Sequence, residues 1–347
     1  MPAMAATTNG PQIRSLALYT LAAAHLLPSC HQSSPGPAVQ TVRLALSRDA
    51  VTNLPIHLAQ KLGYYQEEGL SVEESDVAGL SKGMEALLGG SVDVVGASPM
   101  VVIQVALEGR LVKSFLTLYS LPYGALVVAP VATDTIHTIA DLKGHRVGVS
   151  SPGSPTQLFL NYSLVSSGLS TADVSTVAIG TGAASVAAVE HGQVDAAELV
   201  GGAIPLMQRR HPEMKFLADT RTAEGAKAVF GSSAFPSMSL VAGDPWLKAN
   251  AETARRLVRA TRKAMRWMGA HSAEEIRAEM TDAQRMPDAE ADLEAIRGAQ
   301  RILSPDGVMP AEGPETVRKV LAASNEKART AHLDLSTTYT NEFVIHP

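Results

Sequence analysis

Short apolar runs alternate with longer amphipathic runs along most of the chain, and glycine, proline or serine often stands between them. Apolar runs of about four to eight residues are typical of strands, and apolar residues three and four positions apart are typical of helices. The pattern predicts strands at 42–47, 70–75, 92–97, 112–119, 122–130, 146–150, 174–180, 194–200, 214–220 and 235–243. It predicts helices at 54–62, 81–88, 99–108, 155–167, 183–191 and 204–209, and an amphipathic helical segment from about Pro245. Alternating strands and helices favour an α/β fold with parallel-rich sheets and right-handed crossovers.

The early part of this pattern recurs later in the chain. Three landmarks reappear in the same order, each about 100 residues further along, a spacing typical of a domain. They are Arg43-Leu-Ala-Leu-Ser47 with Arg146-Val-Gly-Val-Ser150, Gly69-Leu-Ser with Gly168-Leu-Ser, and Asp93 with Asp195. We therefore expect two similar lobes.

The strand-like stretches 122–130 and 235–243 lie where the chain leaves one repeat and where it leaves the other. We expect them to be crossover strands, with 41–121 and 237–347 forming lobe I and 122–236 forming lobe II. The helical C-terminal segment is expected to pack back on lobe I. The 347 residues suffice for two domains of ordinary size. Two lobes joined by two strands would make a hinged clamp.

The N-terminal stretch has the layout of a secretion signal. The run Leu16–Leu27 is mostly apolar, follows Arg14 and precedes Cys30, the one cysteine of the chain. A positive residue, a short apolar run and a small residue before a cleavage site are the order found in signal peptides, and a cysteine after such a run resembles the bacterial lipoprotein signal. We expect residues 1–29 to be a signal peptide, Cys30 to carry lipid and 30–40 to be a flexible tether. The alternative is a cytosolic N-terminus with an incidental cysteine.

Composition and charge argue against several classes of function. The net charge is −5, and aromatic residues make up 4% of the chain. Since there is no basic stripe and few aromatic side chains to stack on bases, nucleic acid is not an expected partner. No HExxH, HxH or CxxC motif occurs, and the histidines are scattered. We therefore predict no metal site, no cofactor and no catalytic residue.

Candidate ligand-binding residues lie where predicted strands end. In open parallel sheets, ligands bind beyond the carboxyl ends of the strands, and the start of the following helix presents backbone N–H groups that bind oxyanions. The stretch SPGSPT (151–156) supplies glycine, hydroxyl donors and a proline at such a start. The same residue types also serve as plain helix caps. The predicted ligand-binding residues are Ser47, Arg48, Asn53, Gly79, Leu80, Ser81, Ser98, Tyr123, Ser151, Gly153, Ser154, Pro155, Thr156, Glu198 and Gly201.

Several charged and aromatic candidates allow two interpretations. Glu198, near the end of an apolar strand, either meets an amine or ring N–H of the ligand or pairs with a neighbouring cation. Arg48 either holds a carboxylate or sulfonate or faces solvent. Tyr123 is either a lid over the ligand or packing at the hinge. Asp93 and Asp195 follow helix-ending turns and are expected to hold those turns rather than bind ligand.

Four stretches resemble the substrate-binding proteins of nitrate/sulfonate/taurine-type ABC importers. They are PIHLAQKLGYYQEEGL (55–70), EALLGGSVDVVGASP (85–99), IADLKGHRVGVSSPGSPTQ (139–157) and AAVEHGQVDAA (187–197). The resemblance implies a type II periplasmic-binding-protein-like fold and capture of a small solute between the lobes. At ELVGGAIP (198–205) the chain departs from many such proteins, which have an aromatic-Glu-Pro segment there, so the solute stays open.

The expected function is therefore that of an extracytoplasmic solute-binding lipoprotein. It would deliver a small anionic or zwitterionic organic solute, sulfonate-like in chemistry, to an ABC permease and its ATPase. We expect a monomer in the periplasm or at the cell surface, attached to a bacterial membrane by its lipid. Two alternatives remain: an enzyme on the same fold that acts on a pyrimidine-like or other small metabolite, and a ligand-sensing module that gates a partner protein.

Overall fold

The computed structural model describes residues 39–47, 51–77 and 80–347, and of Leu80 and Ser81 it describes the backbone alone. Strands are β1 (Gln40–Ser47), β2 (Leu70–Val77), β3 (Val94–Ala97), β4 (Val112–Tyr119), β5 (Gly124–Val128), β6 (Arg146–Val149), β7 (Ser175–Ala178), β8 (Ala196–Val200), β9 (Phe216–Asp219) and β10 (Met238–Gly243). Helices are α1 (Leu54–Lys61), α2 (Tyr64–Glu67), α3 (Leu80–Leu88), α4 (Pro99–Leu107), α5 (Pro155–Ser166), α6 (Ala183–Glu190), α7 (Ala203–Arg210), α8 (Ala223–Phe230), α9 (Asp244–Ala249), α10 (Ala251–Ala270), α11 (Ala273–Glu279), α12 (Ala289–Ile302), α13 (Gly313–Ala322), α14 (Glu326–Thr330) and α15 (Glu342–Ile345). Short 3-10 turns occupy Pro130–Ala132, Ile139–Leu142, Thr171–Asp173 and Leu335–Thr338.

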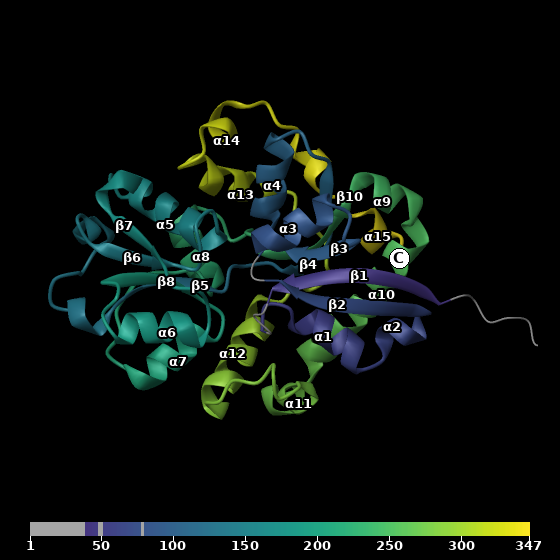
Figure 1. Ribbon diagram of the computed structural model, residues 1–347, viewed down its shortest axis with the longest axis horizontal. Coiled ribbons are helices and arrows are strands. Elements are labelled where there is room, and N and C mark those ends of the chain that lie inside the picture. The colour runs from purple at the N-terminus through teal and green to yellow at the C-terminus, as the bar shows by residue number, and fades with distance from the viewer. Residues whose placement is uncertain (1–38, 48–50, 78–79) are drawn as a thin grey trace, which may run out of the picture. The chain divides into compact units, whose positions relative to one another are not determined.

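The strands form two five-stranded sheets with the same topology (Figure 1). One has the order β2-β1-β3-β10-β4 and the other the order β7-β6-β8-β5-β9. In each, three neighbouring strands are parallel and the fourth in the row runs antiparallel to the strands beside it. We call the first sheet with its helices lobe I and the second lobe II. The duplication predicted from the sequence is thus confirmed at the level of strand order.

In each sheet, the antiparallel strand is the one that the chain enters directly after leaving the other lobe. Strand β5 follows β4 of lobe I but pairs with β8 and β9 of lobe II, and β10 follows lobe II but pairs with β3 and β4 of lobe I. These are the two predicted crossovers. Both are shorter than predicted because Pro122, Pro130 and Pro236 flank them, and proline has no N–H to donate to a ladder.

Equivalent arginine–aspartate pairs join the start of β3 to β1 in lobe I and the start of β8 to β6 in lobe II. Asp93 accepts hydrogen bonds from the backbone N–H of Arg43 at 2.9 Å and from its Nη2 at 2.7 Å. Asp195 accepts the equivalent bonds from Arg146 at 2.9 and 2.8 Å. Burial alone would raise the pKa of each carboxyl, but the arginine hydrogen bonds outweigh it and hold both pKa values below the usual value. These aspartates therefore bind a neighbouring strand, whereas the sequence analysis expected them to hold the helix-ending turns.

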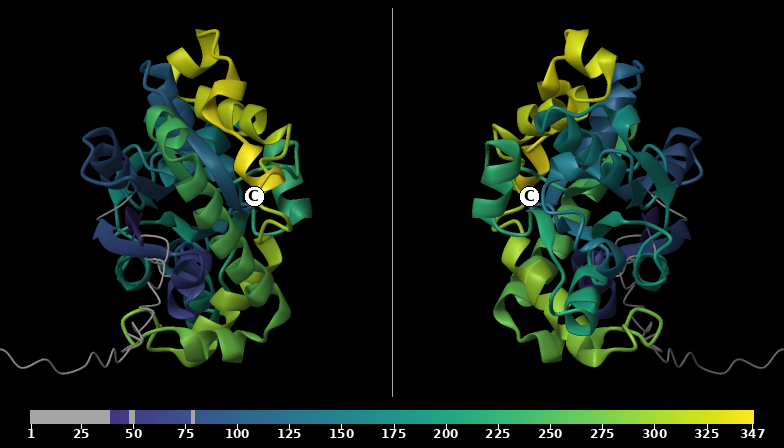
Figure 2. Two further views of the ribbon diagram at one scale, coloured as in Figure 1. Left: turned by 90° about the vertical axis from the view of Figure 1, so that its right-hand side faces the viewer. Right: turned by 90° about the vertical axis from the view of Figure 1, so that its left-hand side faces the viewer.

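The C-terminal helices contact both lobes, which the sequence analysis did not predict. Helix α10 packs on α1 and α2 of lobe I, whereas α12 packs on α7 and α13 packs on α5, both of lobe II. Figure 2 shows these helices, coloured green to yellow, on two sides of the sheets. None of the helices in the described residues is both long and apolar enough to cross a membrane.

Helix α8 was also missed, although its sequence carries both end signals. The Thr222 hydroxyl caps its start by accepting from the Gly225 N–H at 3.0 Å. Gly231 ends it in the left-handed region at φ 76°, which favours glycine. The threonine cap, with a glycine stop nine residues later, was sufficient to predict this helix.

Candidate functional site

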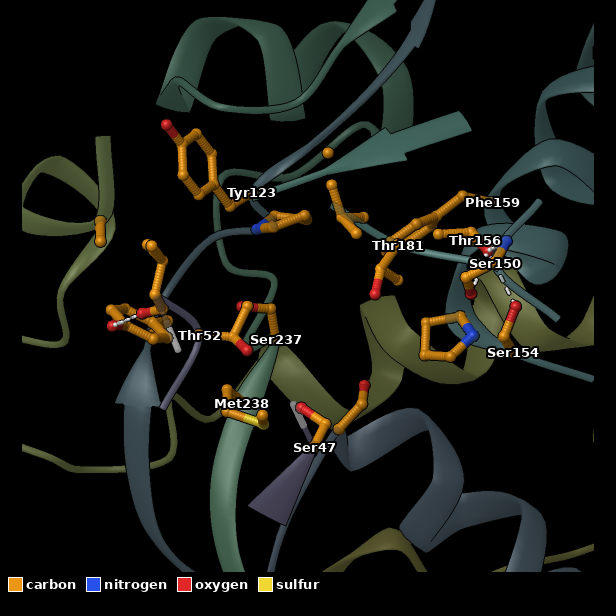
Figure 3. A pocket seen from close by; sticks show the side chains of 18 of the residues that line it. Ser47, Thr52, Tyr123, Ser150, Ser154, Thr156, Phe159, Thr181, Ser237 and Met238 are labelled. Atoms are coloured by element: carbon orange, nitrogen blue, oxygen red, sulfur yellow. Dashed lines mark hydrogen bonds between the residues drawn. The ribbon is translucent and has the colours of Figure 1, made fainter. Parts of the chain in front are cut away.

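A cavity of about 310 Å³ lies where the carboxyl ends of the parallel strands in the two lobes meet (Figure 3). Lobe I contributes strand-end and loop residues, lobe II contributes the start of α5 and neighbouring loops, and the crossovers and α12 complete the wall. The lining residues are Ser47, Val51, Thr52, Val77, Ser98, Tyr119, Pro122, Tyr123, Gly124, Ser150, Ser151, Ser154, Pro155, Thr156, Phe159, Gly180, Thr181, Val200, Ser237, Met238, Ala299 and Ile302. We call this cavity the cleft.

The start of α5 forms a network of hydroxyl groups on the lobe II side of the cleft. Thr156 Oγ1 accepts a hydrogen bond from the Ser150 N–H at 2.9 Å and lies 2.9 Å from the Ser150 hydroxyl. It also lies 2.8 Å from the Ser154 hydroxyl, which donates to the Ser151 carbonyl at 2.6 Å. Ser154 caps the helix and Pro155 occupies its first turn. The buried hydroxyls thus fix the turn in place, and the N-terminal end of a helix dipole faces the cleft.

Two further hydroxyls on this side are exposed. Ser151 and Thr181 line the cleft, and within the described residues neither side-chain hydroxyl has a hydrogen-bond partner. In Figure 3, Thr181 lies beside Ser150, Ser154 and Phe159 of lobe II, and Ser47 of lobe I lies across the cavity. No described residue that lines the cleft carries a charged side chain. The cleft therefore presents neutral donors beside apolar wall.

About half of the predicted binding residues line the cleft. They are Ser47, Ser98, Tyr123, Ser151, Ser154, Pro155 and Thr156. Arg48 and Gly79 lie outside the described residues, as does Cys30, and the side chains of Leu80 and Ser81 are not described. Asn53, Gly153, Glu198 and Gly201 do not line the cleft.

Each of these four has a structural reason for its position. Asn53 is fully buried and stands at the α1 N-cap, but its side chain makes no capping bond; its Nδ2 donates to the Ser47 carbonyl at 2.8 Å and so fixes the end of β1. Gly153 supplies the left-handed turn before α5 (φ 72°) and donates to Gln157 Oε1 at 2.6 Å. The Gly201 N–H donates to the Tyr123 carbonyl at 3.0 Å, joining the end of β8 to the crossover.

Glu198 lies behind the cleft wall rather than in it. It is 5% exposed and stands opposite Leu126 in the β5–β8 pair. Its Oε1 would lie 3.1 Å from a Cβ atom on Gly124, a cleft residue, so the missing side chain makes room for the carboxyl. Within the described residues the carboxyl has no hydrogen-bond or ion-pair partner. Burial first, and then the nearby Asp219 charge, raise the pKa of Glu198 well above its usual value.

Tyr123 packs against α12 at the hinge. Its hydroxyl donates to the Glu294 carbonyl at 3.4 Å, and its ring fills the space that a side chain on Gly298 would need. This packing agrees with the second interpretation of Tyr123, and since the residue also lines the cleft, its contact with a ligand stays a prediction.

The lining residues outside the predicted set include two kinds. Ser150 and Gly180 follow the ends of β6 and β7, so the strand-end rule was enough to find them, as it was to find Thr181. Ala299 and Ile302 come from α12, far along the chain, and carry no local signal. In the described residues, no cluster of three or more His, Cys, Asp or Glu side chains could hold a metal ion.

Two lobes of identical strand order, joined by exchanged strands around a cleft, define a periplasmic-binding-protein fold. The family model described as NMT1/THI5 like matches residues 51–275, and the chain belongs to this family. No curated protein matches the chain.

Solved structures with this fold include a protein of Bordetella bronchiseptica RB50 at 31% identity, covering 88% of this chain and 96% of its own, with a TM-score of 0.82. The periplasmic aliphatic sulphonate binding protein SsuA from Escherichia coli is 17% identical, covers 86% and 91%, and has a TM-score of 0.65. The periplasmic nitrate-binding protein NrtA from Synechocystis PCC 6803 is 15% identical, covers 88% and 87%, and has a TM-score of 0.66. At these two lower identities the likeness concerns the fold.

We predict that Glu198→Gln stabilises the protein increasingly as pH rises from about 4 to 8. Since the pKa of Glu198 is higher in the folded protein than in the unfolded chain, the wild type loses stability as pH rises above the unfolded pKa. Glutamine has no titrating carboxyl and avoids this loss. The measurement is the free energy of unfolding by urea at several pH values for the wild type, Glu198→Gln and Glu108→Gln, which removes an exposed glutamate. A stability difference for Glu198→Gln that does not change with pH would contradict a neutral buried carboxyl.

Proposed function

We propose that this protein is the solute-binding component of an ABC importer, and that it holds a small organic oxyanion in the cleft. One observation supports the proposal most strongly. The start of α5 and the hydroxyls of Ser151 and Thr181 line the same cavity and face lobe I across it. Helix starts and hydroxyls bind oxyanions without a charged side chain. The predicted ligand-binding residues that line the cleft are the ones that we propose contact this solute.

A sulfonate-like solute fits this environment best. The cleft joins its hydroxyl donors to apolar side chains such as Phe159, Val200, Met238 and Ile302, which suits an oxyanion head attached to a short organic body. Burial and the Asp219 charge raise the pKa of Glu198 and so disfavour a negative charge behind Gly124. The sulphonate- and nitrate-binding proteins that share the fold carry oxyanion ligands in their names, which supports this class.

The proposal extends to location and domain organisation. We place the protein in the periplasm or at the cell surface, as a monomer with its permease and ATPase as partners, and assign no catalysis to it. Residues 1–29 are the proposed signal peptide, and 30–40 the proposed tether. Lobe I would comprise 41–121 and 237–347, and lobe II 122–236. The apolar run before Cys30 supports the signal, and the strand exchange near 122 and 237 supports the lobe boundaries.

The first test is a thermal-shift screen with ethanesulfonate, taurine, nitrate and an aminopyrimidine, because a ligand that binds the folded state raises its stability by mass action. We expect an oxyanion ligand to raise the melting temperature. For the best ligand, Ser151→Ala combined with Thr181→Val is expected to weaken binding about tenfold or more, measured by calorimetry, since each loses a hydrogen bond to a charged group.

The matched control is Ser166→Ala, which removes an exposed hydroxyl from the opposite end of α5. Both variants should melt close to the wild type, because Ser151, Thr181 and Ser166 are all exposed. Equal affinity in the double variant and the control would refute the oxyanion cradle. Conversion of the ligand to a product during the titration would favour the enzyme alternative instead.

The lipid anchor has its own test. We predict that Cys30→Ser releases the protein from the membrane fraction of expressing bacteria and abolishes labelling by an alkynyl fatty acid. The physical reason is that a thioether-linked lipid needs a cysteine thiol, and Cys30 is the one cysteine of the chain. Unchanged membrane association and labelling in the variant would contradict the lipoprotein assignment.

A further inference from the structure

A second cavity, of about 490 Å³, lies between α12 and lobe II. Lobe II supplies residues of α7, β9 and the loop before α8, and α12 supplies Glu294 and Arg301. Tyr123 belongs to the walls of both this cavity and the cleft. We call the second cavity the rear cavity. Apart from Tyr123, none of its lining residues takes part in the proposed function.

Three arginines line the rear cavity, and they differ in how they are paired. Arg221 is held firmly: its Nε and Nη2 donate to the two Asp219 oxygens at 2.8 and 2.6 Å, and its Nη1 donates to Gln208 at 3.1 Å. Arg209 makes a longer pair with Asp288, at 3.3 Å. Arg301 is exposed, and within the described residues its guanidinium has no hydrogen-bond or ion-pair partner.

Each of the two carboxylates that line the rear cavity has an arginine partner. Burial would raise the pKa of Asp219, but its hydrogen bonds from Arg221 outweigh burial and lower that pKa. Glu294 accepts from Arg297 at 2.7 Å, and Arg297 also pairs with Glu274 and Glu290. Within the described walls, Arg301 is therefore the arginine that has no carboxylate partner.

The periodicity of α12 explains why Arg301 points to this cavity. Glu294, Gly298 and Arg301 recur at spacings of four and three, so they share one helix face. Tyr123 lies on that face, against Glu294 and Gly298. Ala299 and Ile302 lie on a different face and line the cleft. One helix thus serves two separate cavities.

We propose that the rear cavity binds a small oxyanion, a carboxylate or a phosphate, held by Arg301 of α12 and by the preorganised Arg221 of lobe II. An arginine presents paired N–H donors that match two oxygens of such a group. This site is separate from the cleft. We expect its ligand to be a second molecule, with more negative charge than the ligand that the neutral donors of the cleft bind. Its position between α12 and lobe II lets the ligand bridge the two.

The test is a titration of the full chain with inorganic phosphate, and separately with succinate, at ionic strength held constant with chloride. The melting temperature should rise and saturate with at least one of them. Arg301→Gln should raise the half-saturating concentration roughly tenfold. Arg266→Gln, which removes an exposed arginine of α10 with no partner among the described residues, should respond as the wild type does. Preference between phosphate and succinate identifies the oxyanion.

The outcomes separate this site from the cleft. The double variant Ser151→Ala with Thr181→Val should keep the wild-type response, because neither residue lines the rear cavity. A response lost in that variant would place the anion in the cleft and overturn the rear site while leaving the proposed function intact. A rise no larger than chloride produces, or an equal loss in Arg301→Gln and Arg266→Gln, would also overturn it.

Discussion

The exchange of one strand between two otherwise parallel sheets determines the architecture of this protein. Because β5 follows β4 of lobe I but pairs in lobe II, and β10 follows lobe II but pairs in lobe I, the chain crosses between the lobes twice while every strand ladder stays within one lobe. The same exchange turns the carboxyl ends of both sheets toward a common space. The residues that end strands in either lobe therefore become neighbours, and the cleft follows from topology before any side chain is considered.

Charge is distributed to suit this arrangement. The ion pairs Arg43–Asp93 and Arg146–Asp195 join β3 to β1 and β8 to β6. In contrast, no described residue of the cleft lining is charged. The carboxyl nearest the cleft wall, Glu198, is buried without a partner and favours its neutral form. An ionised carboxylate in that low-dielectric place would repel an anion in the cleft, and a neutral one does not. The rear cavity differs from the cleft, since three arginines line it and, within the described residues, Arg301 has no carboxylate partner.

Much of the fold and part of the site could be predicted from the sequence. The segments Gly90-Ser-Val-Asp93 and Gly192-Gln-Val-Asp195 precede equivalent strands, β3 and β8, and their aspartates bind Arg43 of β1 and Arg146 of β6. The strand-end rule found SPGSPT (151–156), since helix starts carry recognisable caps. Other residues gave no such signal. Asn53 is a residue type that caps helices, but its side chain binds the Ser47 carbonyl instead. Glu198 lies on the same strand face as Val200, yet only Val200 reaches the cleft, and the alternation of strand residues does not distinguish the two.

The binding site can be located by a crystal structure of the protein with the ligand identified in the thermal-shift screen. We predict that the oxyanion lies at the start of α5, within hydrogen-bonding distance of Ser151 or Thr181, while the body of the ligand touches lobe I. A ligand bound to the outer surface of one lobe, with the cleft filled by water alone, would contradict it.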